Sequence, residues 1–219
     1  AAREAGSGEV GTLCVAAIPS FSAAVLSRAV AGFRRQHAGV RLTILEDSSA
    51  SVAELVERGV AEIGFVQAPA GGNRLAFHPL HDERFVVLNR SASPLGKAGR
   101  WTVSRLAAAD FILFKGNVRA RVLEWCRGNG FEPNVVCETG ELETVHALVS
   151  AGMGIAILPE MAAVRAGSRL VVSGLPGAAV TRRLGYLTAR GPALGRMAEA
   201  FLKCVGEVLR VPVEKLGWS

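Results

Sequence analysis

Residues 10–46, VGTLCVAAIPSFSAAVLSRAVAGFRRQHAGVRLTILE, decide the fold because they hold one complete strand–helix–strand unit. The apolar run at 10–17 predicts a short buried strand. Apolar residues at helical spacing predict a helix from residue 20 to about 37. Alternation of apolar and polar residues at 40–46 predicts a second strand. A strand, a crossover helix and a second strand of this length are typical of a parallel sheet with right-handed connections.

The following residues extend this unit. A short helix is expected at 52–58, capped by Ser49 or Ser51, and a third buried strand at 63–66. Ser20 or Ser22 is the expected cap of the first helix. The chain up to residue 66 therefore predicts a β-α-β-α-β arrangement.

A second α/β run follows. Its expected elements, in chain order, are a strand at 85–88, a helix at 103–109, a strand at 111–114, a helix at 118–127, a strand at 135–137, a helix at 142–151, a strand at 155–158, a helix opened by Pro159, strands at 170–172 and 184–188, and a helix at 192–209. We therefore expect two α/β lobes, with the second inserted into the first. The crossings are expected near 82–85 and 188–190, which gives one subdomain at 9–83 and 190–219, another at 84–189, and a separate segment at 1–8.

Composition narrows the function classes. Half of the 219 residues are hydrophobic and the net charge is +6. The basic residues are dispersed, which favours an anionic ligand only weakly and gives little support for direct DNA binding. The longest apolar runs are too short to cross a bilayer, and the opening AAREAGSGEV has no apolar core of a secretory signal.

Motifs of catalysis are missing from the sequence. It contains no GxSxG elbow, no P-loop and no HExxH, so we expect no catalytic residue and no cofactor. His78 and His81 fall on an expected extended segment, which sends them to opposite faces, so we expect no metal site. The four cysteines, at 14, 126, 137 and 204, lack metal-ligand spacing. They are expected to be buried free thiols, with a redox-sensing thiol as the open alternative.

Three stretches carry a resemblance to a known family. GEVGTLCVAAIPSFSAAVLSRAVAGFRRQHAGVRLTI, SVAELVERGVAEIGFV and LVSAGMGIAILP resemble, in this order and spacing, the effector-binding domain of LysR-type transcription regulators. The likeness covers about residues 8–209. Ala38 stands where the family usually has proline, and Glu62 where it usually has aspartate.

The resemblance implies a fold like that of type 2 periplasmic binding proteins, with two Rossmann-like lobes joined by two crossing strands. A small effector would bind in the cleft between the lobes, and its binding would be passed to a DNA-binding domain that precedes Ala1. Segment 1–8 would be the end of the linker to that domain. The resemblance also implies a cytoplasmic homodimer or tetramer, in which 20–37 and 40–46 of one subunit meet 118–127 and 135–137 of another.

Ligands of open parallel sheets bind beyond the carboxyl ends of the strands, where helices begin and expose N–H groups to an anion. Strand ends and the resemblance together predict the following ligand-binding residues: Ser20, Phe21, Ser49, Gln67, Lys115, Asn117, Val118, Met153 and Gly154. Each polar residue among them has a second interpretation, as a helix cap or a solvated surface group, and Phe21 and Met153 could be packing residues.

Two other functions remain open from the sequence. A stand-alone solute-binding protein of a transport system could have the same fold. An enzyme on this fold would need an acid, base or nucleophile among the expected cleft residues, which are serine, glutamine, asparagine and lysine.

Overall fold

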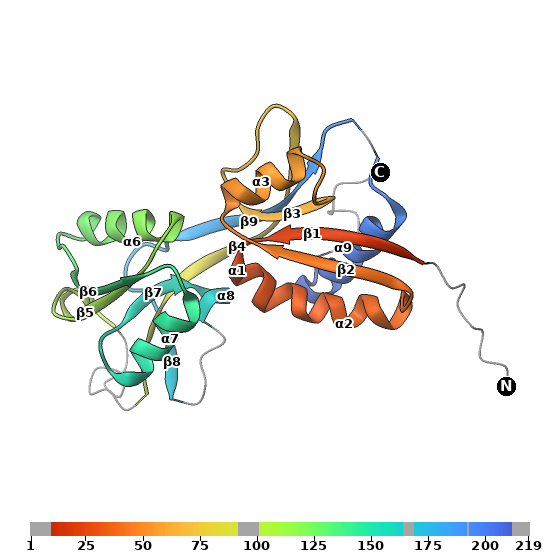
Figure 1. Ribbon diagram of the computed structural model, residues 1–219. Coiled ribbons are helices and arrows are strands. Elements are labelled where there is room, and N and C mark those ends of the chain that lie inside the picture. Colours follow the sequence, from red (N-terminus) through yellow and green to blue (C-terminus); the bar gives the residue numbers. More distant parts are fainter. Residues whose placement is uncertain (1–9, 92–100, 164–168, 192, 212–219) are drawn as a thin grey trace. The chain divides into compact units, whose positions relative to one another are not determined.

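The computed structural model describes residues 10–91, 101–163, 169–191 and 193–211, with the side chain of Asn117 left out, so the expected linker at 1–8 lies outside the described residues. The chain divides into two compact units (Figure 1). Unit 1 comprises Ala1–Asp82 and Arg183–Ser219, and unit 2 comprises Glu83–Arg182. The first crossing lies within the expected range, whereas the return to unit 1 lies at Arg183 and not at residue 190.

The sheet of unit 1 has three parallel strands at its start. β1 (Gly11–Ala17) lies between β2 (Val40–Glu46) and β3 (Ile63–Gln67) and runs parallel to both, which confirms the predicted β-α-β-α-β arrangement. β9 (Thr181–Ala189) then pairs antiparallel with β3, and β4 (Leu75–Arg90) lies beside β9. The pairing of β9 with β3 is the reason that residues 183–189 belong to unit 1.

The first helix of unit 1 is continuous but irregular. It consists of α1 (Pro19–Phe21), the π-helical turn η1 (Ser22–Leu26) and α2 (Ser27–Gln36). No side chain caps its start, so the expected capping role of Ser20 or Ser22 is wrong, and Pro19 instead occupies the first turn, where its missing N–H costs nothing.

The next helix, α3 (Ser49–Glu57), begins three residues earlier than expected. Its cap is Ser48, whose side chain accepts a hydrogen bond from the backbone N–H of Ser51. The prediction that Ser49 or Ser51 caps this helix is therefore wrong, because the cap precedes both residues. The last helix, α9 (Arg196–Leu209), has Gly195 as its N-cap and so begins later than expected. The expected start, residue 192, lies outside the described residues.

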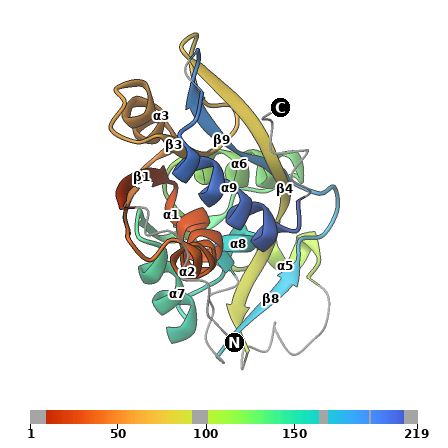
Figure 2. The same ribbon diagram turned by 90° about the vertical axis from the view of Figure 1, so that its right-hand side faces the viewer.

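Helices cover both faces of the unit 1 sheet. α2 and α9 pack together on one face and α3 covers the other, as Figures 1 and 2 show. On the α2–α9 face the ring of Phe65 lies between two other rings, stacked on Phe21 at 4.8 Å and edge-on to Phe201 at 6.5 Å. Phe201 also meets Phe33 at 5.4 Å. All four rings are fully buried, so they form the centre of this core.

Unit 2 is built on a mixed set of strands. Its part of β4 pairs antiparallel with β7 (Ala156–Pro159) on one side and with β8 (Leu170–Gly174) on the other. β5 (Asp110–Phe114) and β6 (Asn134–Thr139) run parallel, and Phe111 forms a parallel bridge to Ile155 just before β7. The strand order is therefore β6-β5-β7-β4-β8.

The helices of unit 2 also lie on two faces. α6 (Asn117–Gly128) and α5 (Val103–Ala107) pack over one core, and α7 (Leu142–Ala151) and α8 (Glu160–Ala163) over the other. Figure 1 shows α6 and α7 on opposite sides of β5 and β6. Pro159 ends β7 and does not open a helix, so that expectation is wrong. None of the helices within the described ranges is both long and apolar enough to cross a membrane.

Candidate ligand-binding edges

Three of the predicted residues meet at the carboxyl edge of the unit 1 sheet. β1, β2 and β3 are parallel, so their ends share one edge. Ser20 follows β1, Ser49 follows β2 and Gln67 is the last residue of β3. Their exposed fractions are 6%, 8% and 4%, so each has only a small surface at this edge.

Ser49 connects the helix that follows β2 to the end of β3. Its Oγ accepts a hydrogen bond of 3.2 Å from the backbone N–H of Gln67. The hydroxyl hydrogen of Ser49 can still donate, because a serine hydroxyl both accepts and donates. Ser49 is therefore a donor that is held in place at the edge.

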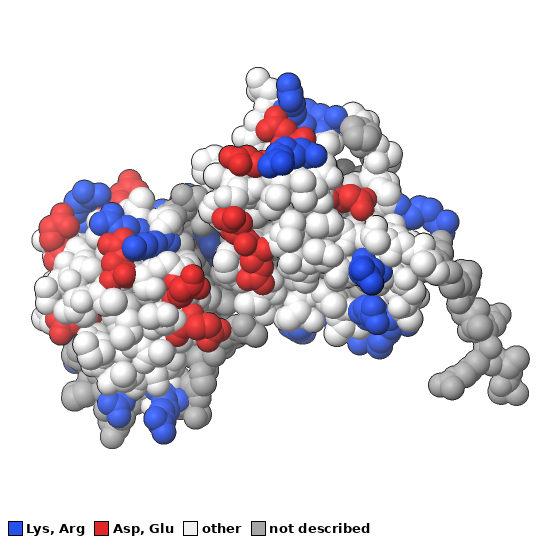
Figure 3. Space-filling model, in the orientation of Figure 1, with Lys and Arg blue, Asp and Glu red and all other residues white. Residues whose placement is uncertain are grey.

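Two carboxylates lie at the same edge, and sequence reasoning missed them. Ser22 Oγ donates a 2.5 Å hydrogen bond to Glu46 Oε1, and Asp47 Oδ1 accepts a 2.6 Å bond from the backbone N–H of Ser48. Figure 3 shows acidic side chains gathered at the end of β2. An anion at this edge would therefore depend on the N–H groups at helix starts for its attraction, since these acidic side chains repel it.

Phe21 does not lie at the surface of this edge. Its ring is fully buried and stacks on Phe65 with 12° between the ring planes. Its backbone N–H donates to Ile18 O at 3.0 Å and is used inside the first turn. Phe21 is a core residue in this structure, which agrees with the second of its two interpretations.

The carboxyl edge of β5 and β6 gives the corresponding region of unit 2. Lys115 follows β5, its side chain is exposed, and its backbone N–H donates to Thr139 O at 2.9 Å. Gly116 is the N-cap of α6 with a φ of 88°, a conformation that glycine adopts without strain. Asn117 opens α6, but its side chain lies outside the description. The side chain of Val118 is 5% exposed and packs in the core, so only its backbone faces the helix start.

The structure separates Met153 and Gly154 from Lys115. Both precede β7, and the backbone N–H of Ile155 donates to O of Asp110, the first residue of β5. Because β5 and β7 are parallel at this bridge, residues before them lie at the edge opposite to the residues after them. A Cβ on Gly154 would lie 2.5 Å from Asp110 O, so its glycine is explained by close packing. We therefore remove these two residues from the set, although Met153 is 53% exposed.

Residues that follow β6 and β7 replace Met153 and Gly154 as candidate ligand-binding residues of unit 2. Thr139 ends β6, and its Oγ1 accepts from the backbone N–H of Glu141, which is the N-cap residue of α7. Glu160 follows β7 and opens α8. Lys115 was predicted because it follows a strand. The same rule predicts these residues when it is applied to the observed ends of β6 and β7.

A buried ion pair lies where the chain passes between the units. The Nε and Nη2 of Arg182 both bind the carboxylate of Glu83, and Glu83 Oε2 accepts from the backbone N–H of Met161 at 3.0 Å. The two side chains are 3% and 1% exposed. Burial lowers the pKa of Arg182 from its ordinary value, and the charge of Glu83 opposes that shift. Sequence reasoning had no signal for this pair, because its members are 99 residues apart.

One imidazole, that of His78, and three of the four thiols lie in packed surroundings. His78 stacks on Tyr186 at 4.6 Å, and its Nε2 lies 3.2 Å from Thr188 Oγ1. Burial raises the pKa of the Cys126 thiol to about 11, and it also raises the pKa values of Cys14 and Cys204. Such thiols are poor nucleophiles at neutral pH, which disfavours the redox alternative at these three positions. Among the described residues, no three His, Cys, Asp or Glu side chains form a group that could hold a metal ion.

Comparisons with known proteins agree with this architecture. The family model "LysR substrate binding domain" matches residues 6–210. The cofactor-binding domain of the Cbl transcriptional regulator has the same fold, with a TM-score of 0.83 at 18% identity over 99% of this chain and 96% of that chain. The effector-binding domain of QuiR, solved with shikimate, has a TM-score of 0.75 at 16% identity over 92% of this chain and 98% of that chain.

A named relative extends the comparison to a whole regulator. The probable HTH-type transcriptional regulator LrrA of Synechococcus elongatus is 29% identical over 167 residues, which are 76% of this chain and 56% of the relative. The chain thus spans about half the length of the curated relatives it matches.

The fold is that of the effector-binding domains of transcription regulators, which resemble type 2 periplasmic binding proteins. The chain belongs to the LysR substrate-binding domain family, as the resemblance predicted, and this family is not enzymatic.

Proposed function

We propose that this chain is the sensory part of a LysR-type transcription regulator and binds a small metabolite at the carboxyl edges of its parallel strands. The match over residues 6–210 is the observation that carries this proposal. The edge of unit 1 supports it, because Ser20, Ser49 and Gln67 present polar groups on a buried scaffold. The named relatives are regulators, which favours this function over a stand-alone solute-binding protein.

The mechanism that we propose is a population shift. A ligand signals only if it binds one conformation of the domain more tightly than another. A coupling of about 1–3 kcal/mol gives a response of about 5- to 150-fold. The DNA-binding domain of the parent protein and its place in the cytoplasm belong to the same proposal, since about half of each relative lies outside this match.

The proposed ligand is an anion such as a small carboxylate. Support comes from the helix starts after β1, β2 and β5 and from the exposed Lys115 beside the start of α6. Glu46 and Asp47 work against it, so the carboxylate would have to lie closer to the N–H groups than to these side chains. Lys115, Asn117 and the backbone of Val118 remain in the proposed set with Thr139, Glu141 and Glu160.

The experiment is a thermal-shift screen of small carboxylates, each paired with its neutral methyl ester, followed by calorimetry on the hits. A ligand that binds only the native state raises the melting temperature. We expect Ser49→Ala to weaken binding about fivefold or more, because one donor is lost. Ser27→Ala, on the exposed side of the same unit, is the matched control.

The outcomes separate two parts of the proposal. Binding of esters but not of acids overturns the anion and leaves the sensory function in place. If Ser20→Ala and Ser49→Ala both bind the hits with unchanged affinity, the edge of unit 1 is not the site.

We also propose that the chain self-associates through β2 and α2 of one copy and β6 and α6 of another. β2 and β6 each end the strand order of their unit, and Val135 and Val136 on β6 are 39% and 44% exposed. Figure 3 shows basic side chains over the α2–β2 region. Val136→Asp should shift the sedimentation coefficient to that of a monomer, whereas Val60→Asp, at an equally exposed valine of unit 1, should not. A wild-type chain that sediments as a monomer at all concentrations overturns this arrangement.

A further inference from the structure

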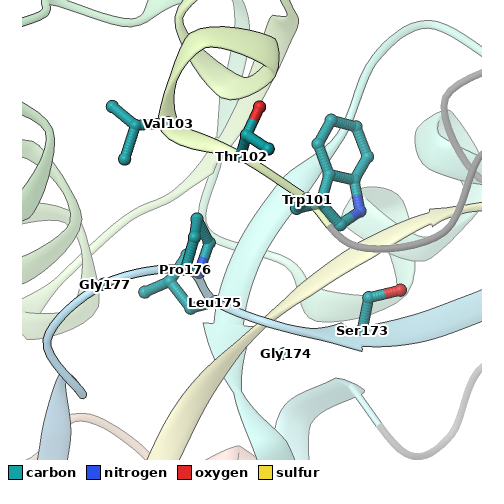
Figure 4. A pocket seen from close by; sticks show the side chains of 8 residues that line it. All are labelled: Trp101, Thr102, Val103, Ser173, Gly174, Leu175, Pro176 and Gly177. Atoms are coloured by element: carbon teal, nitrogen blue, oxygen red, sulfur yellow. The ribbon is translucent and has the colours of Figure 1, made fainter.

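Unit 2 contains a pocket of about 730 Å³ that the proposed ligand edges do not use (Figure 4). Trp101, Thr102 and Val103, which lead into α5, form one side of it, and residues 173–177, from the end of β8 onward, form the other. β4 and β7 separate β8 from β5 in the strand order. At about 4.8 Å a strand, the pocket lies roughly 14 Å along the sheet from the β5 end at Lys115.

The lining of this pocket favours an uncharged molecule. Trp101, Val103, Leu175 and Pro176 supply apolar surface, and none of the described residues that line the pocket is charged. The Thr102 hydroxyl already accepts from the backbone N–H of Arg105, because Thr102 caps α5. An ion would lose its hydration here without gaining a partner of opposite charge, so ions are disfavoured.

Trp101 brings a donor that lacks an acceptor. Its side chain belongs to the core and is 4% exposed, and its Nε1–H has no hydrogen-bond partner in the described part of the chain. Buried polar groups are almost always paired, and an unpaired one lowers stability. Figure 4 shows the indole nitrogen on the side of the ring towards Ser173. The atom has less than 1 Å² of exposed surface, so an acceptor reaches it only if the pocket wall moves.

We propose that this pocket is a second small-molecule site, which takes an uncharged aromatic molecule with one hydrogen-bond acceptor. The aromatic part packs against Trp101, Leu175 and Pro176, and the acceptor takes the Nε1–H of Trp101. The volume is in the range of pockets that hold drug-sized ligands, which is about 300–1,000 Å³. This site goes beyond the proposed sensing at the carboxyl edges, because it uses neither their residues nor their charge.

The test uses three probes of nearly equal shape on the 219-residue chain. Acetophenone carries a carbonyl acceptor, ethylbenzene carries none, and benzoate carries a charge. We expect acetophenone to move the Nε1–H resonance of Trp101 in a ¹H–¹⁵N spectrum in a saturable way. Acetophenone should bind about five- to tenfold more tightly than ethylbenzene, which is the gain from one hydrogen bond that satisfies a buried donor. Benzoate should leave the Trp101 resonance unmoved, whether or not it binds at the carboxyl edges.

Two variants separate the parts of this site. Trp101→Phe keeps an aromatic ring and removes the N–H, so the two neutral probes should then bind equally. Gly174→Leu should abolish binding of both, since a Cβ at Gly174 meets no atom within 4 Å and the side chain extends into open space beside the pocket. Gly128→Leu, at a glycine of α6 with equally open surroundings, is the control for added volume. Circular dichroism checks that each variant is folded.

Each of the following results would contradict one part of the proposed second site. The site is wrong if acetophenone leaves the Trp101 resonance unmoved, or if Gly174→Leu binds acetophenone as well as Gly128→Leu does. The acceptor contact is wrong if Trp101→Phe keeps the preference for acetophenone. The exclusion of charge is wrong if benzoate moves the Trp101 resonance as acetophenone does. None of these results depends on the carboxyl edges, which Ser49→Ala tests separately.

Discussion

Units 1 and 2 reach similar α/β architectures with different interiors. The centre of unit 1 is a set of phenylalanine rings that pack against one another, with Phe65 between Phe21 and Phe201. All three buried side-chain polar atoms that lack a partner in the described residues belong to unit 2, and they are Asn89 Oδ1, Trp101 Nε1 and Trp125 Nε1. The buried Glu83–Arg182 pair belongs to unit 2 as well. The comparison teaches that, among the described residues, the same layering can keep its buried polar atoms paired, as in unit 1, or can carry some unpaired ones at a cost to stability, as in unit 2.

The largest effect is expected from removing one member of the buried ion pair of unit 2. Arg182→Met leaves the Glu83 carboxylate buried without its counter-charge, and the expected loss of unfolding free energy is about 3–5 kcal/mol. Urea denaturation measures it. Asp82→Asn is the control, because it breaks the adjacent but exposed Asp82–Arg183 pair and should cost less than about 1 kcal/mol. Equal losses in the two variants would contradict the difference in burial.

The second test compares one tightly packed glycine from each unit. In Gly154→Ala the new Cβ meets the backbone oxygen of Asp110 at 2.5 Å, whereas in Gly64→Ala it meets the side chains of Val56 and Val52 at 2.7 and 2.8 Å. Side chains yield more easily than backbone, so we expect Gly154→Ala to lose about 3 kcal/mol and Gly64→Ala about 1–2 kcal/mol. Thermal unfolding of both variants gives the order. The reverse order would show that unit 1 is the less compliant unit.

A third test compares the two buried amides. Gln67 in unit 1 is 4% exposed, and neither of its side-chain polar atoms is among the buried atoms of the described residues that lack a partner, so Gln67→Leu should cost about 1–2 kcal/mol. Asn89 in unit 2 donates to Arg90 O, but its Oδ1 has no partner in the described chain. Replacing it with a side chain of similar shape removes an unpaired acceptor, so Asn89→Leu should change stability by less than about 1 kcal/mol. Denaturant midpoints measure both, and a large loss for Asn89→Leu would indicate an unrecognised partner.

The smallest effect concerns pH and belongs to unit 1. Burial, with the nearby charge of Arg190 as a second cause, lowers the pKa of His78 below its ordinary value of 6.5. The unfolded chain therefore binds this proton more readily, and stability is full above pH 6.5 and falls as the pH drops towards the folded-state pKa. His78→Gln should reduce this slope between pH 7 and pH 5, measured as denaturant midpoints. His81→Gln, at an exposed position on the same strand, controls for the loss of an imidazole, and an unchanged slope in His78→Gln would contradict the assignment.

The sequence predicted the parallel part of unit 1 well. Apolar periodicity determined β1, β2 and β3 to within about a residue, because each strand is buried and bounded by clear turn residues. Helix caps were less predictable. Three nearby serines, at 48, 49 and 51, are chemically equivalent as caps, and only the backbone geometry selects Ser48.

The candidate site was predictable only where strand direction was known. Ser49 and Gln67 follow from the strand-end rule, and their hydrogen bond shows that they are neighbours. Met153 was placed at the cleft although it precedes a strand, and the structure puts it at the edge opposite to Lys115, which follows one. The Glu83–Arg182 pair could not be found from local pattern at all, since it depends on pairing between segments far apart in the chain.

The continuity of unit 2 has a consequence for biosynthesis. Glu83–Arg182 forms one uninterrupted stretch, whereas unit 1 is completed only by Arg183–Ser219. On the ribosome, unit 2 emerges before most of β9 and all of α9 do, and domains generally fold as units during synthesis. The rings of Phe33 and Phe65 then remain uncovered on the side that Phe201 contacts in the finished protein. The N-terminal part of unit 1 is therefore the last part of the two units to be covered, and chaperones that bind apolar surface would meet it in that interval.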